Sequence, residues 1–189
     1  MTLALIPLLP FLSFLILILA GRRLGRAAPA VSLAALGGSA LLSIWVFRAL
    51  LAGHEPLRMS WLWLPFGKNP VTLGLLADPL SSVMLLVVTV VGSLIMLYSI
   101  GYMREDPRFS RFFAYISLFC CAMLTLVLAD HFILLYIGWE GVGLCSYLLI
   151  SFWFEKDSAA NAGKKAFLTT RVGDLGLLAA ILLIARKDS

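Results

Sequence analysis

Three ionisable side chains lie deep inside long apolar runs of this sequence. Glu140 is the single charged residue of the run 132–154. At about 1.5 Å of rise per residue, Glu140 lies about 14 Å from His131, after which the uncharged run of a predicted helix over 129–154 starts. That depth is near the middle of a hydrocarbon core about 30 Å thick. An ionised carboxylate costs roughly 3 kcal/mol there, so we predict that Glu140 faces protein or water and has a function.

Arg171 and Asp174 form a second candidate pair. They are three residues apart and share one face of a predicted helix over 166–185. This helix runs antiparallel to the one that carries Glu140, and Arg171 lies about 12 Å and Asp174 about 16 Å from the cytoplasmic end of the continuous helix. All three groups therefore lie at a similar depth. Either they form a fragment of a proton relay, or Arg171 and Asp174 neutralise each other and hold their helix in place.

Glycines surround the buried acid. Gly138, Gly141 and Gly143 remove side-chain bulk next to Glu140, so another helix or water can approach it closely. Burial away from water favours the protonated carboxyl, which can hold a proton near neutral pH and release it when a cation approaches. The competing interpretation is a carboxylate fixed in a permanent ion pair.

Other polar residues carry weaker signals. Lys164 is seven residues before Arg171 on the same helical face. It is either a cytoplasmic proton entry or one of the positive charges that orient membrane helices. His54 and His131 lie at or beyond the outer boundary, where we expect them to be solvated. Asp130 is the predicted N-cap of the helix that follows it.

The composition indicates an all-α polytopic membrane protein. Of the 189 residues, 61% are hydrophobic, and the mean hydropathy is +0.99. Soluble domains are nearer 45–50% apolar. The net charge is +5, and most of the positive residues lie in particular loops and form no nucleic-acid stripe. We find no glycine-rich phosphate loop, metal-spaced His/Cys cluster or nucleophile triad, and we interpret the three cysteines as packing residues.

The apolar runs predict six transmembrane helices and one short external β-hairpin. The hairpin pairs 58–64 with 71–76 around a Gly/Asn/Pro turn at 65–70. Asp78-Pro79 and Asp106-Pro107 are predicted helix starts. The predicted spans are 3–20, 29–51, 79–102, 110–128, 129–154 and 166–185. We divide the chain into 1–78 with the first two spans and the hairpin, 79–109 with the third span, and 110–189 with the last three.

The distribution of positive charge predicts the orientation. Nine Lys and Arg residues follow the first, third and fifth spans, and four lie on the opposite side. The nine are Arg22, Arg23, Arg26, Arg104, Arg108, Arg111, Lys156, Lys164 and Lys165, and the four are Arg58, Lys68, Arg186 and Lys187. Positive loops are retained in the cytoplasm. We therefore expect a multi-pass protein of the cell inner (plasma) membrane with both termini outside.

Four segments resemble the L subunit of bacterial NADH:quinone oxidoreductase (complex I), the counterpart of mitochondrial chain 5. They are LADPLSSVMLLVVTVVGSLIMLYSIGYM (76–103), DPRFSRFFAYISLF (106–119), GWEGVGLCSYLLISFW (138–153) and KKAFLTTRVGDLG (164–176). The resemblance implies about fourteen core helices with two inverted five-helix repeats that start at the fourth span. It also implies that Glu140 is the essential acid that pairs with a lysine of a seventh span, and that Arg171 and Asp174 match the family's sixth-span pair.

The resemblance further implies a proton-translocating membrane subunit that couples NADH oxidation and quinone reduction to proton pumping. No cofactor is expected in this chain, because NADH, FMN, iron–sulfur clusters and quinone would bind partner subunits. Expected partners are other membrane subunits, including an adjacent antiporter-like subunit, the lipid bilayer and protons, with no nucleic acid.

Three alternatives remain open: the large subunit of a multi-subunit sodium/proton antiporter, a membrane-bound hydrogenase subunit, and a non-catalytic membrane scaffold. The sequence stops after the sixth span, so we expect either a fragment or a truncated reading frame. We also expect that the 189 residues alone would not move protons vectorially.

Overall fold

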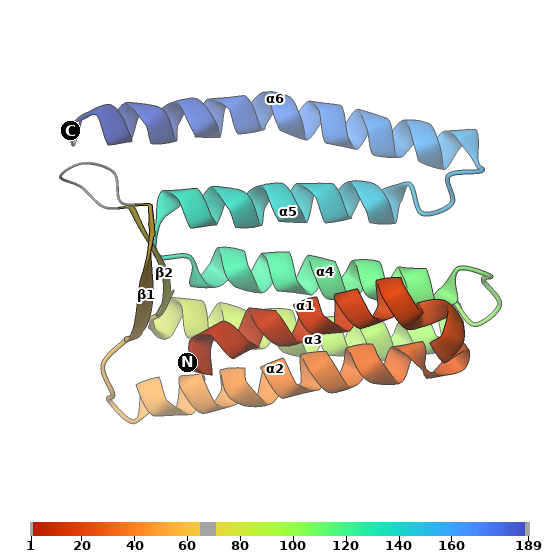
Figure 1. Ribbon diagram of the computed structural model, residues 1–189, viewed down its shortest axis with the longest axis horizontal. Helices are drawn as coiled ribbons and strands as arrows, with labels where there is room; N and C mark the ends of the chain where they lie inside the picture. Colours follow the sequence, from red (N-terminus) through yellow and green to blue (C-terminus); the bar gives the residue numbers. More distant parts are fainter. Residues whose placement is uncertain (1, 65–70, 188–189) are drawn as a thin grey trace.

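The computed structural model describes residues 2–64 and 71–187, and these form six long antiparallel helices and one β-hairpin (Figure 1). The helices are α1 Thr2–Leu24, α2 Ala28–Leu51, α3 Pro79–Tyr102, α4 Phe109–Leu128, α5 Phe132–Ile150 and α6 Asp157–Lys187, with a short 3₁₀ turn η1 Gly25–Ala27 between the first two. The predicted all-α bundle with a small hairpin is confirmed.

Five helical stretches of the described residues are long and apolar enough to cross a membrane. The first of them, Thr2–Leu51, has 50 residues, whereas one crossing needs about 20. It reverses direction at η1, so α1 and α2 lie side by side (Figure 1). The six predicted crossings therefore correspond to six helices.

The predicted hairpin is also confirmed, with strands β1 Leu57–Leu64 and β2 Val71–Ala77. The turn predicted at 65–70 lies outside the described residues. The hairpin covers one end of the bundle, which we call the hairpin end (Figure 1). We call the opposite end, where η1 and the α3–α4 and α5–α6 connections lie, the arginine-rich end.

Asp130 attaches the hairpin to the helices, and its predicted role as an N-cap is wrong. Its backbone N–H donates to the carbonyl of Gly74 at 3.0 Å, and its carboxylate accepts from Arg58 Nε at 2.7 Å. The N-cap of α5 is His131 instead, whose Nδ1 accepts the backbone N–H of Ile133 at 3.2 Å. The Asp130 carboxylate therefore binds an exposed arginine of the hairpin, although the local sequence predicts that it caps α5.

The connection between α5 and α6 also differs from the prediction. The structure ends α5 at Ile150 and begins α6 at Asp157, whereas the sequence predicted a span to 154 and a loop over 155–165. The early start of α6 has a local reason, because alanines are strong helix formers and an acid in the first turn complements the helix dipole. Gly163 does not interrupt α6. Because glycine has no side chain, α6 packs closely against Ser151 at this position.

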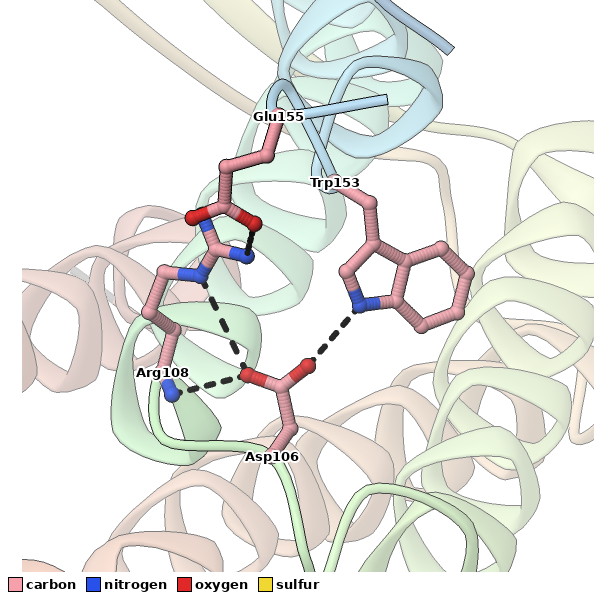
Figure 2. A network of polar contacts seen from close by, with 4 residues as sticks. All are labelled: Asp106, Arg108, Trp153 and Glu155. Carbon is pink, nitrogen blue, oxygen red and sulfur yellow. Dashed lines mark hydrogen bonds and ion pairs between the residues drawn. The ribbon is translucent and has the colours of Figure 1, made fainter. Parts of the chain in front are cut away.

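Asp106 does not cap α4 as predicted, because Arg108 occupies the N-cap position. Its carboxylate accepts the backbone N–H of Arg108 at 2.8 Å and the indole N–H of Trp153 at 2.8 Å. Arg108 Nη2 in turn donates to Glu155 at 2.9 Å. Figure 2 shows that this network joins the α3–α4 connection to the α5–α6 connection.

Small polar residues hold the helices close together in the interior. Ser39 Oγ of α2 donates to the carbonyl of Ile6 in α1 at 2.7 Å, and Ser110 Oγ of α4 donates to the carbonyl of Gly21 at 2.8 Å. Such contacts are typical of membrane bundles, where apolar burial gives little drive for helix association.

The start of α3 generates a first prediction. The Asp78 carboxylate accepts the backbone N–H of Ser81 at 2.7 Å, and Ser81 Oγ accepts the backbone N–H of Asp78 at 2.8 Å. The hydrogen bond from the Ser81 backbone lowers the pKa of Asp78, which precedes the membrane-spanning part of α3. We expect Asp78→Ala to destabilise the protein by about 1 kcal/mol at pH 7, measured as a lower Tm in detergent.

The dependence of this loss of Tm on pH is the control for the capping role of Asp78. A carboxyl whose pKa is lowered by folding contributes stability above its unfolded pKa, and that contribution is lost as the pH falls through the folded value. The Tm difference between the native protein and Asp78→Ala should therefore narrow below about pH 4. Asp78→Asn keeps a capping oxygen and should lose little stability at pH 7. An equal loss in both variants would contradict the capping role.

Candidate functional site

Helix α5 lies unusually close to α4 because glycines face the contact. A Cβ atom at Gly138 would lie 2.9 Å from the Leu126 backbone, and one at Gly141 would lie 3.0 Å from Ala122 Cβ. Cβ atoms in proteins essentially never lie as close as 2.9 Å to a backbone atom of another helix, so position 138 requires glycine. The contact with α4 fixes the rotation of α5 and therefore the direction in which Glu140 points.

A third glycine makes room for charge on the other side of α5. A Cβ atom at Gly143 would lie 3.2 Å from Arg171 Nη2 of α6. Because Gly143 has no side chain, the guanidinium can lie against α5, one turn from Glu140. The close approach expected at these glycines is thus observed, toward α4 at two of them and toward α6 at the third.

The three predicted ionisable residues come together in what we call the charged triad. Arg171 Nη1 forms an ion pair with Glu140 Oε2 and lies 3.4 Å from Asp174 Oδ2. The common depth predicted from helix rise is therefore observed. Arg171 does not pair with Asp174 alone, as one interpretation held, because it bridges carboxylates from two helices.

Two aromatic residues that we did not identify from the sequence complete the site. The indole N–H of Trp139 donates to Asp174 Oδ1 at 2.7 Å. The Arg171 guanidinium carbon lies 4.4 Å from the centroid of the Phe167 ring, a cation–π contact. Two features of the sequence could have identified these aromatic residues: Trp139 is adjacent to Glu140, and Phe167 lies one helical turn before Arg171.

The charges of the triad do not cancel. Two carboxylates and one guanidinium sum to −1, so one bound proton makes the group neutral. Side-chain exposure is 25% for Glu140 and 8% for Asp174. The hydrogen bond from Trp139 holds the Asp174 carboxylate in place. Glu140 is therefore the more accessible carboxylate of the two.

A cavity of about 670 Å³ lies beside the triad between α4, α5 and α6. Asp174, Trp139 and Gly143 contribute to its wall, together with mostly apolar side chains and the hydroxyls of Ser146 and Thr170. The cavity leaves room for water or for side chains of another helix next to Asp174.

The structure does not bring Lys164 into this site. Lys164 is exposed on α6, and two helical turns, about 10 Å, separate it from Arg171. His131 is exposed at the hairpin end. Within the part of the chain that the structure describes, no group of His, Cys, Asp and Glu gathers as metal ligands would.

Fold and site together define a polytopic helical membrane protein with a charged triad inside the bundle. Two family profiles match the chain. The first is described as NADH-ubiquinone oxidoreductase (complex I), chain 5 N-terminus, and covers residues 63–113. The second is described as NADH:quinone oxidoreductase/Mrp antiporter, TM, and covers residues 129–188, which include the whole triad.

Named relatives agree with these profiles. NADH-quinone oxidoreductase subunit L of Mycobacterium tuberculosis (strain H37Rv) is 47% identical over 187 residues, which cover 93% of this chain and 28% of that protein. F(420)H(2) dehydrogenase subunit L of Methanosarcina mazei is 45% identical over 181 residues, which cover 95% and 26% respectively. The chain therefore spans about a quarter of the length of these relatives.

A solved structure shares the fold. The Mrp complex from Dietzia sp. DQ12-45-1b contains a chain that matches with a TM-score of 0.82 and 30% identity, over 100% of this chain and 20% of that one. The resemblance found in the sequence is confirmed: the chain belongs to the antiporter-like family of membrane subunits that the NADH:quinone oxidoreductases share with Mrp antiporters.

The contact of α5 with α4 generates a second prediction. We expect Gly138→Ala to destabilise the bundle by about 1–3 kcal/mol, because the new methyl group must push α5 away from the Leu126 backbone. The measurement is the Tm of the purified protein in detergent. Gly37→Ala in α2 is the control, since a Cβ there meets nothing within 4 Å. Equal Tm values for the two variants would contradict the close packing.

Proposed function

We propose that this chain is part of the proton-translocating membrane subunit of an NADH:quinone oxidoreductase. The observation that carries the proposal is the charged triad, in which Arg171 bridges Glu140 and Asp174 with an uncompensated charge of −1. Ionisable groups inside a membrane are costly and typically mark ion pathways. The family membership supports protons as the cargo and a respiratory complex as the context.

In the proposed mechanism, Glu140 is the group that exchanges the proton. When Glu140 binds a proton, its attraction for Arg171 weakens, and the guanidinium then interacts mainly with Asp174. Trp139 keeps Asp174 in place during this exchange. A cation that approaches from a neighbouring helix would reverse the step, since it stabilises the charged carboxylate. The chain itself would carry no redox group.

The remaining parts of the proposal concern the assembly. NADH, FMN, iron–sulfur clusters and quinone would bind partner subunits, and an adjacent antiporter-like subunit would pack against this one. The arginine-rich end would face the cytoplasm of a cell with the protein in its plasma membrane, because loops rich in Lys and Arg are retained there. Both ends of the described chain lie at the hairpin end, which would then face outward (Figure 1).

A sodium/proton antiporter subunit is the second candidate function. It is favoured by the match to a chain of the Mrp complex, which covers the whole of this sequence. The two functions differ in their driving force. An antiporter exchanges protons for sodium without electron transfer, whereas the proposed subunit moves protons only during NADH oxidation.

The third prediction tests the role of Glu140 in the native membrane assembly. We expect Glu140→Gln to reduce NADH-driven proton uptake into vesicles by about tenfold or more, because positioned acid–base groups typically contribute 10²-fold or more to proton-transfer rates. Glu105→Gln is the control, since Glu105 is exposed in the α3–α4 connection. Unchanged pumping by a normally assembled Glu140→Gln complex would reject the proposal in favour of a scaffold.

The fourth prediction tests the coupling inside the triad. Arg171→Gln leaves Glu140 and Asp174 without their shared cation, and losing one partner of a buried pair costs about 3–5 kcal/mol. Adding Glu140→Gln removes one of the two stranded charges. We therefore expect the double variant to have a higher Tm in detergent than Arg171→Gln alone. Additive losses in the double variant would show that the two side chains do not interact in the folded protein.

A further inference from the structure

A basic pocket of about 440 Å³ lies at the arginine-rich end, far along the bundle from the hairpin. It forms where the end of α1 and η1 meet the start of α4. Its lining includes five arginines, Arg22, Arg26, Arg104, Arg108 and Arg111. The proposed proton chemistry uses none of them, and positive-inside bias accounts for their side of the membrane but not for their convergence on one cavity.

Helix contacts hold the walls of this pocket in place. Ser110 Oγ donates to the Gly21 carbonyl at 2.8 Å, and a Cβ atom at Gly21 would lie 3.0 Å from Ser110 Cβ. The end of α1 therefore touches the start of α4 directly. Gly25 has a φ of +47°, a conformation that side chains disfavour, which allows the sharp turn that brings Arg26 to the pocket.

The pocket carries a large uncompensated positive charge. Asp106 is the one acid in its lining, and Glu155 outside the lining pairs with Arg108, so five arginines and two carboxylates sum to +3. The Asp106 carboxylate is already engaged by Trp153 and by the backbone of Arg108. Arg22, Arg26, Arg104 and Arg111 form no ion pair with any residue that the structure describes.

Unused donors also point to an anionic ligand. Arg108 has only 15% of its side chain exposed, and its Nη1 atom is buried without a hydrogen-bond partner among the described residues, while its Nε lies 4.0 Å from Asp106 Oδ1. The N-terminus of α4, with its positive dipole end, lies in the same wall. Guanidinium groups match phosphate oxygens with two parallel hydrogen bonds.

The apolar part of the lining distinguishes a lipid from a free anion. Leu17 and Ile18 of α1 complete the pocket. Ile18 is 45% exposed, and the next residue, Leu19, is 84% exposed on the outer surface of α1. A ligand with its phosphate among the arginines could therefore extend an acyl chain along α1 toward the bilayer.

We propose that this pocket binds the headgroup phosphate of an anionic phospholipid, with phosphatidylglycerol as the simplest member of the class. The inference goes beyond the proposed proton function, because it concerns a separate site at one end of the bundle. Basic pockets between transmembrane helices are suited to such headgroups, and each Lys or Arg near an anionic surface contributes about 1 kcal/mol. The bound lipid would link the end of α1 to the start of α4 on the lipid-facing side of the bundle.

The fifth prediction uses a photoactivatable phosphatidylglycerol in phosphatidylcholine vesicles that contain the native assembly. We expect labelling of peptides that cover 17–26 and 104–111, displaced by unlabelled phosphatidylglycerol. The triple variant Arg22→Gln, Arg26→Gln and Arg111→Gln should weaken the apparent affinity on the order of 100-fold. Arg23→Gln is the matched control, since this exposed arginine lies next to Arg22 and does not line the pocket.

Three outcomes would overturn the proposal. Equal labelling of the triple variant and Arg23→Gln would show that the pocket arginines do not bind the lipid. Equal labelling by a photoactivatable phosphatidylcholine would show that the headgroup charge is not recognised. Displacement by inorganic phosphate as effectively as by phosphatidylglycerol would assign the pocket to a free anion. If the triple variant does not assemble, Arg26→Gln alone should weaken binding about fivefold.

Discussion

The central constraint on this bundle is the cost of placing charge inside a membrane. Arg171 meets that constraint by bridging one carboxylate on its own helix and one on α5. The arrangement requires α5 and α6 to keep a fixed register and rotation. Gly138 sets the rotation of α5 against α4, and Gly143 admits the guanidinium from the other side. Gly138 and Gly143, which have no side chains, thus determine where the charged side chains can lie.

Polar links at both ends of the helices support this register. At the hairpin end, Asp130 joins the α4–α5 connection to β1 and β2 through Arg58 and Gly74. At the arginine-rich end, Asp106 and Arg108 join the start of α4 to the α5–α6 connection (Figure 2). Since α6 packs mainly against α5, these links restrain movements that would separate Glu140 from Arg171.

Regular geometry explains what the sequence could predict. Helix rise is constant, so residue counting placed Glu140, Arg171 and Asp174 at one depth before any contact was known. Contacts between distant segments could not be predicted in this way. The bond from Trp139 to Asp174 depends on how two helices face each other, and Asp130 left its expected capping role because a hairpin residue 72 positions away bonds to it. Local signals also misplaced the start of α6, where polar residues that suggest a loop are compatible with an alanine-rich helix.

The length of α6 has a mechanical consequence. Its 31 residues extend about 46 Å, and hiding that length in a core about 30 Å thick would need a tilt of about 50°, beyond the 0–40° that membrane helices adopt. The polar segment from Asp157 to Lys165 must therefore lie outside the hydrocarbon core, where Gly163 packs against Ser151 at the end of α5. Because α6 is continuously helical from this segment to Arg171, a displacement of the segment would be transmitted directly to the ion pairs that Arg171 forms.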